Sequence, residues 1–174
     1  HPVVLVGLAG VDAPRLDRLA AAGVAVLCTY QAKGAVADEA SAGLFTGGAL
    51  ERPLLEAADL VLAVGVDPVE PIPAAWSYDA PVVMLHPEPV DGRWFGEPEV
   101  VVGALAHTLP AVTDVLDHRW DPGTAAAHRR GALAAMKLRA LVPGYRPTQA
   151  SEHEKVHTVL TAMEVLGTQL KQSA

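Results

Sequence analysis

The chain has 174 residues, a formal net charge of −7 and a single cysteine. This length allows one domain with an appendage. Acidic residues predominate in residues 1–120, and basic residues are in excess in 121–174. An acidic body disfavours nucleic acid or an anionic membrane as the partner, because phosphate groups are bound by clustered Lys and Arg. We also expect no membrane span, since no apolar run reaches 18 residues, and a single cysteine agrees with a cytoplasmic location.

The composition predicts a sheet that is covered on both faces. Hydrophobic residues make up 51% of the chain and aromatic residues only 5%, which indicates a core of Val, Leu and Ala. Five short runs, apolar apart from Glu99 at the start of the last, predict strands at residues 3–6, 24–28, 60–64, 81–85 and 99–102.

Helices are predicted between these strands. Asp12 is expected to cap a helix that holds Pro14 in its first turn and ends at Gly23. Further helical patterns occupy residues 50–58 and 103–117. Strands that alternate with helices imply right-handed β-α-β units. The expected fold class is therefore α/β, with a Rossmann-like, doubly wound parallel sheet.

The pattern changes after Trp120. Asp121-Pro122-Gly123 interrupts it, and helices are expected at residues 124–141 and 151–171, with no strand between them. We therefore expect one domain over residues 1–120, followed by a linker and C-terminal helical appendage over residues 121–174.

The segment Gly7-Leu8-Ala9-Gly10 lies between a predicted strand and a helix, where Rossmann-like folds place phosphate-binding backbone. The spacing departs from G-x-G-x-x-G, so the glycines can also serve only to make a tight turn. The second strand ends in Cys28-Thr29-Tyr30, without an acidic residue to hold a ribose. An ordinary NAD-dependent dehydrogenase is therefore disfavoured.

A zinc-hydrolase pattern occurs near the C-terminus. His153, Glu154 and His157 match H-E-x-x-H, in which two His share a helical face and the Glu activates a zinc-bound water. Ser151 and Glu154 also form a helix capping box, which accounts for Glu154 without a metal. The zinc hydrolase remains a minor alternative.

Four segments in series resemble the central domain of thiamine-diphosphate-dependent enzymes, the family of acetolactate synthase and benzoylformate decarboxylase. They are a strand and turn over 3–10, Thr29-Tyr30-Gln31-Ala32-Lys33-Gly34, the A-D-L-V-L-x-V-G strand over 58–65, and the strand and acidic-Pro turn over 81–89. The resemblance covers roughly residues 2–117. It implies the DHS-like NAD/FAD-binding type of Rossmann-like fold.

The resemblance implies that this domain performs no chemistry itself. In the family, thiamine diphosphate and Mg²⁺ lie between two other domains, one of which supplies a G-D-G segment that is absent here. The parent enzyme would be a 2-keto acid decarboxylase or acetolactate-synthase-like carboligase, assembled as a homodimer or homotetramer. Because the chain opens at His1 and reaches a strand by about Val3, we expect it to be a piece of a longer protein.

Some relatives bind FAD or ADP in this domain. The flavin-binding members carry an Arg two residues after the strand-ending Gly, where this chain has Asp67. FAD is therefore disfavoured, while ADP stays open as a ligand. The residues implied for a nucleotide crevice are Gly7, Gly10, Lys33, Gly34, Gly47 and Gly48. A stand-alone nucleotide-binding sensor with the same crevice is the alternative from another functional class.

Overall fold

The computed structural model describes residues 1–70, 75–116 and 120–141. Its centre is a six-stranded sheet in the order β3-β2-β1-β4-β5-β6, and every neighbouring pair is parallel. The strands are β1 (Pro2–Val6), β2 (Ala25–Cys28), β3 (Gly43–Leu44), β4 (Leu60–Val64), β5 (Val82–His86) and β6 (Glu99–Val102). The fold is therefore Rossmann-like α/β, as predicted.

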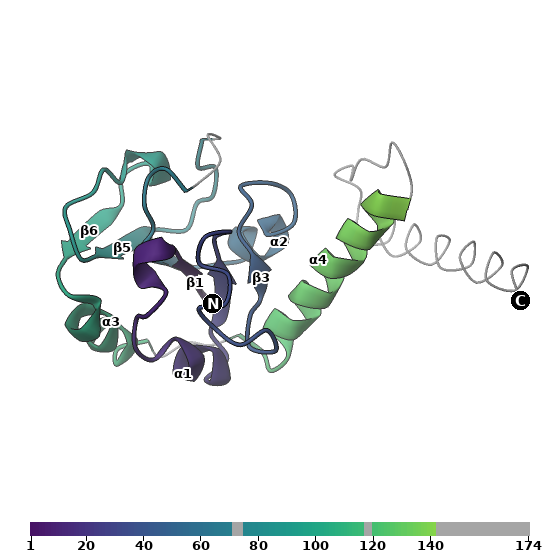
Figure 1. Cartoon of the computed structure of the whole chain (residues 1–174), viewed down its shortest axis with the longest axis horizontal. Coiled ribbons are helices and arrows are strands. Elements are labelled where there is room, and N and C mark those ends of the chain that lie inside the picture. The colour runs from purple at the N-terminus through teal and green to yellow at the C-terminus, as the bar shows by residue number, and fades with distance from the viewer. Residues whose placement is uncertain (71–74, 117–119, 142–174) are drawn as a thin grey trace, which may run out of the picture. The chain divides into compact units, whose positions relative to one another are not determined.

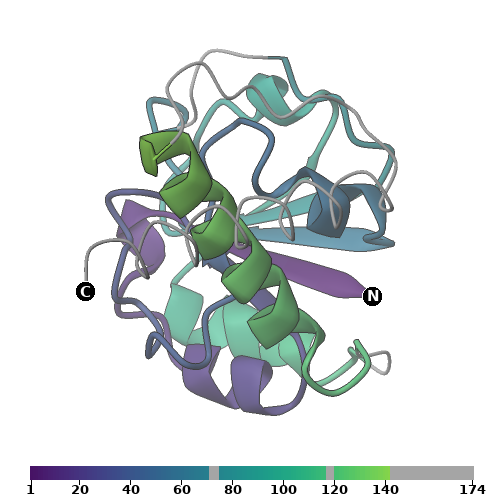
Figure 2. The same ribbon diagram turned by 90° about the vertical axis from the view of Figure 1, so that its right-hand side faces the viewer.

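Helices cover both faces of this sheet (Figures 1 and 2). Helices α1 (Leu16–Ala21) and α3 (Leu105–Thr113) bury their leucines on one face, against strand residues such as Val4 and Leu62. Helix α2 (Arg52–Glu56) covers the opposite face with Leu54 and Leu55. Because both faces are covered, β1, β2 and β4 are apolar throughout.

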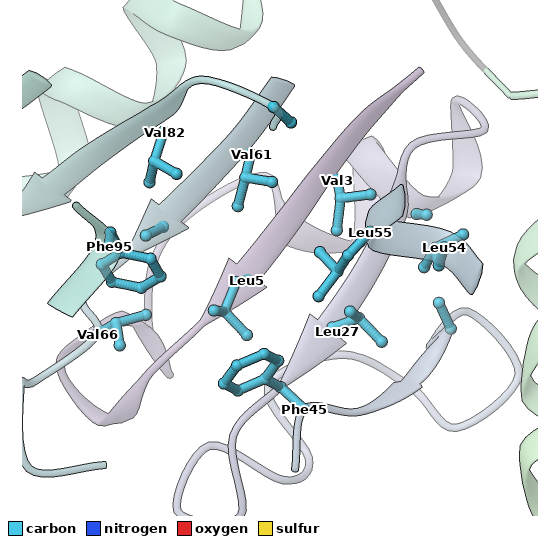
Figure 3. Packing of buried hydrophobic residues seen from close by; sticks show 14 of the residues in the cluster. Val3, Leu5, Leu27, Phe45, Leu54, Leu55, Val61, Val66, Val82 and Phe95 are labelled. Carbon is cyan, nitrogen blue, oxygen red and sulfur yellow. The ribbon is translucent and has the colours of Figure 1, made fainter. Parts of the chain in front are cut away.

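Aromatic loops complete the cover on the α2 face. Leu54 and Leu55 lie over β1 and β2, while Phe95 lies over β4 and β5 (Figure 3). Trp76 packs edge-on against Trp94, with ring centroids 5.5 Å apart, and against Phe95 at 5.0 Å. Rings from the β4–β5 and β5–β6 connections thus cover the part of this face that α2 does not reach.

The connections reverse direction between β1 and β4. The chain passes from β1 to β2 and β3 on the α1 face, then crosses by α2 to β4 and continues outward to β5 and β6. The loops after β1 and β4 therefore leave the sheet in opposite directions. In doubly wound sheets, this switch point at the carboxyl ends of the strands opens the crevice that holds ligands.

Two details of the predicted elements are wrong. Helix α1 is not capped by Asp12: it begins at Leu16, after Arg15 in the left-handed region at φ 69°. Pro14 keeps Ala13 out of helical backbone, and the left-handed Arg15 then delays the first helical residue to Leu16. Strand β3 was not expected, because its two residues lie in what reads as a loop.

Residues 124–141 form helix α4, with the predicted bounds. The chain clusters into two compact units, the first spanning His1–Leu133 and the second beginning at Ala134. Before α4, the indole N–H of Trp120 donates to the carbonyl of Pro2 at 2.8 Å, which fixes this segment to the amino end of β1. The predicted helix over 151–171 lies outside the described residues.

Candidate functional site

The backbones of the β1 and β4 loops touch at the switch point. Gly65 adopts φ +61°, and a Cβ on it would lie 2.1 Å from the amide nitrogen of Gly10. A Cβ on Gly10 would in turn lie 2.3 Å from the carbonyl oxygen of Val64. These glycines are needed for close contact between two loops of the chain, which accounts for them without a ligand.

Most amides of the Gly7–Gly10 loop donate to backbone carbonyls. The N–H of Gly7 donates to Val64 at 2.9 Å, that of Ala9 donates to Gly65 at 3.0 Å, and that of Gly10 donates to Gly7 at 2.8 Å. The N–H of Leu8 is the exception, and it donates to both carboxylate oxygens of Glu70, each at 3.0 Å. The donors expected to hold a phosphate are therefore engaged within the chain.

The loop after β2 joins the same carboxylate. Thr29 is buried, and its hydroxyl donates to Glu70 at 2.5 Å while it accepts the N–H of Ala32 at 3.2 Å. Lys33 and Gly34 follow on the exposed part of this loop, where Gly34 adopts φ +98° with open space around it. Thr29 therefore ties this loop to the β1 and β4 loops through Glu70, while Lys33 and Gly34 form its exposed tip.

The loop after β3 is organised around a second carboxylate. Glu51 is fully buried and accepts the N–H of Thr46 at 3.1 Å, the hydroxyl of Thr46 at 2.9 Å and the N–H of Gly48 at 2.8 Å. Gly47 lies between these donors at φ +67°. The loop therefore closes around Glu51 at the start of α2.

The six predicted site residues all lie in segments that follow β1, β2 or β3 at the carboxyl edge of the sheet, and Gly10 ends a short 3-10 helix there. Hydrogen bonds join the first two of these loops through Glu70, while Gly47 and Gly48 close around Glu51. Neither glutamate was singled out from the sequence. The one local signal was their position, since each follows a turn-forming segment, Thr46-Gly47-Gly48 or Asp67-Pro68.

Asp67 has a structural role beside Glu70. Its carboxylate accepts the N–H of Val69 at 2.9 Å, and its own N–H donates to Glu70 at 2.8 Å. The side chain thus shapes the turn that presents Glu70 to the crevice. The two carboxylates also make this edge of the β4 loop negatively charged.

Cys28 and His86 lie at the carboxyl ends of β2 and β5. Burial raises the pKa of the Cys28 thiol to about 11, so it behaves as a small core residue, as predicted. His86 is buried, and its Nδ1 lies 2.8 Å from the carbonyl oxygen of Glu88. Its Nε2 is buried without a hydrogen-bond partner among the described residues.

The described residues contain no cluster of three or more His, Cys, Asp or Glu side chains that is suited to a metal ion. None of their helices is both long and apolar enough to cross a membrane. The H-E-x-x-H pattern at His153, Glu154 and His157 lies outside the described residues.

No protein-family model matches the chain, and neither does any curated protein sequence.

Proposed function

We propose that the chain is the non-catalytic central domain of a thiamine-diphosphate- and Mg²⁺-dependent 2-keto acid decarboxylase or acetolactate-synthase-like enzyme. The observation that carries this proposal is the hydrogen bonding between the loops at the switch point. Its loops after β1, β2 and β4 are hydrogen-bonded to one another through Glu70. A crevice whose polar groups bind each other stabilises a scaffold and leaves few donors for a reacting ligand.

The order of the resembling segments supports the same function. Thr29 to Gly34 forms the loop after β2, and residues 58–65 contain β4, so both segments meet the crevice. In the proposed parent, flanking domains hold thiamine diphosphate and Mg²⁺, and this domain positions them and packs between subunits of a dimer or tetramer. We place the parent in the cytoplasm, where a single reduced cysteine is stable.

A nucleotide-binding sensor is less well supported. Its phosphates would have to displace the contacts of Leu8 and Thr29 to Glu70, next to a second carboxylate at Asp67. Adding ADP should therefore leave the melting temperature of the chain unchanged. A rise at ADP concentrations far above a plausible dissociation constant would favour the sensor instead.

The decisive test is the native polypeptide in its source cells, detected with an antibody against this chain. Flanking domains of comparable size predict a product about three times heavier than this one. The immunoprecipitate should consume a 2-keto acid only when thiamine diphosphate and Mg²⁺ are supplied. A native product near 18.1 kDa, or a heavy product without cofactor-dependent activity on a panel of 2-keto acids, would refute the proposal.

A further inference from the structure

Glu70 joins three loops that are distant in the sequence. Its Oε1 accepts the N–H of Asp67 at 2.8 Å, its Oε2 accepts the hydroxyl of Thr29 at 2.5 Å, and both oxygens accept the N–H of Leu8. Leu8 lies 62 residues away and Thr29 lies 41 residues away. We call these four residues the Glu70 clamp. It holds the loops after β1, β2 and β4 in one arrangement.

The donors of the clamp are of the kind that binds oxyanions. Backbone N–H groups and a hydroxyl converge on one acceptor-only group, and convergent backbone amides form anion-binding concavities in proteins. The amides of Gly7, Ala9 and Gly10 are already bound to carbonyls. The Leu8 and Asp67 amides, from the two touching loops, instead both donate to the carboxylate of Glu70.

The carboxylate also occupies the space directly beside Gly7. A Cβ added to Gly7 would lie 2.6 Å from Oε1 of Glu70 and 2.3 Å from the Cα of Val66. Gly7 therefore has no side chain where the carboxylate and the β4 loop approach the β1 loop. Gly7, the first glycine of the predicted phosphate-binding loop, therefore leaves room for the Glu70 carboxylate.

We propose that Glu70 is a built-in anion that closes the switch-point crevice to phosphate-bearing ligands. Within the Glu70 clamp, the carboxylate accepts three hydrogen bonds that would otherwise need a bound ligand. The negative charge of Glu70 also repels a phosphate at the same place. Removing the carboxylate converts these donors into a cradle for a small oxyanion. This inference goes beyond scaffolding and holds whether or not the parent uses thiamine diphosphate.

The test is chemical rescue of Glu70→Ala in the 174-residue chain. Loss of the carboxylate should lower the melting temperature by about 5 °C or more, since the buried Thr29 hydroxyl and the partly buried Asp67 amide lose their acceptor. Formate or inorganic phosphate should restore much of this loss, and sodium chloride at equal ionic strength should not. Wild type and Glu97→Ala, which removes an exposed glutamate, should gain only the general stabilisation that phosphate gives as a salt excluded from protein surfaces.

Equal responses of Glu70→Ala to formate, phosphate and chloride would overturn the proposal, as would gains from formate and phosphate that are no larger in Glu70→Ala than in the wild type. If Glu70→Ala does not fold, Glu70→Gln keeps the size of the side chain and removes its charge. Amide hydrogen exchange at Leu8 and Asp67 should then be faster than in the wild type by at least several-fold. Unchanged exchange at both amides would refute the clamp.

Discussion

Glu51 binds Thr46 twice: one carboxylate oxygen accepts the backbone N–H at 3.1 Å, and the other accepts the hydroxyl at 2.9 Å. The same carboxylate accepts the N–H of Gly48, and no part of Glu51 is exposed to solvent. A buried carboxylate is tolerated only when its oxygens are hydrogen-bonded, so the loop and the side chain stabilise each other.

Replacing Glu51 with Ala should therefore be strongly destabilising. Three donors would lose their acceptor in a buried place, and we expect the free energy of unfolding to fall by about 3 kcal/mol. Urea denaturation measures this loss. Glu56→Ala is the matched control, because Glu56 is exposed at the end of α2 with Arg52 3.8 Å away, and it should cost less than about 0.5 kcal/mol. Similar losses in both variants would contradict this account of Glu51.

Gly65→Ala should disrupt the switch point. A Cβ there meets the Gly10 amide nitrogen at 2.1 Å, and φ is +61°, so both the clash and the backbone conformation oppose any side chain. We expect a loss of about 3 kcal/mol or more in the free energy of unfolding, measured by urea denaturation.

The control for Gly65 is Gly131→Ala. Gly131 lies in helix α4, and a Cβ added there would meet no atom within 4 Å. Ala should therefore raise the free energy of unfolding by about 0.5–1 kcal/mol through its higher helix propensity. A mild effect at Gly65, comparable in size with that at Gly131, would show that the two loops are not in close contact.

Cys28 should resist thiol reagents in the folded protein. Burial raises its pKa from 9.0 to about 11, and the neutral thiol is a poor nucleophile. A disulfide exchange reagent at pH 8 should label it only after denaturation. The unfolded chain loses this proton first, so stability should fall as the pH rises from about 9 toward 11. Cys28→Ala should remove that part of the alkaline loss, and rapid native labelling would contradict the buried position.

His128 should make stability depend on mildly acidic pH. Burial lowers its pKa from 6.5, an effect that the Glu51 carboxylate partly opposes. The unfolded chain therefore binds this proton first, and stability should fall as the pH drops below about 6.5. His128→Gln should weaken this dependence in urea denaturation between pH 7 and 5. His107→Gln, at an exposed position of α3, should leave it unchanged. Identical pH profiles for the wild type and His128→Gln would refute the prediction.

The strands were predictable because their apolar runs are continuous. β4 and β6 have the predicted bounds, and the alternation with helices implied the parallel order. β3 was not predictable, since Gly43 and Leu44 form a strand only by pairing with Leu27 and Cys28. The start of α1 depends on the left-handed backbone of Arg15, a conformation that the residue type does not favour.

The place of the six candidate residues in the fold was predictable, whereas their contacts were less so. Glycine-containing turns after strands indicated the carboxyl edge, and the structure places all six predicted residues there. The partners of these loops could not be inferred, because Glu70 lies 62 residues from Leu8 and its role arises only when the sheet brings their loops together. Local sequence patterns report turns and periodicity, whereas a carboxylate filling a crevice is a property of tertiary packing.

The three tryptophans divide between two parts of the sheet. Trp76 and Trp94 pack edge-to-face in the aromatic cover of the α2 face, whereas Trp120 is hydrogen-bonded to Pro2 at the amino end of β1. Close indole pairs give coupled near-ultraviolet circular dichroism, so the protein carries an optical reporter specific to its loop cover. With Trp120 replaced by Phe, that signal would follow the opening of the aromatic cover separately from the detachment of the chain that leads into α4.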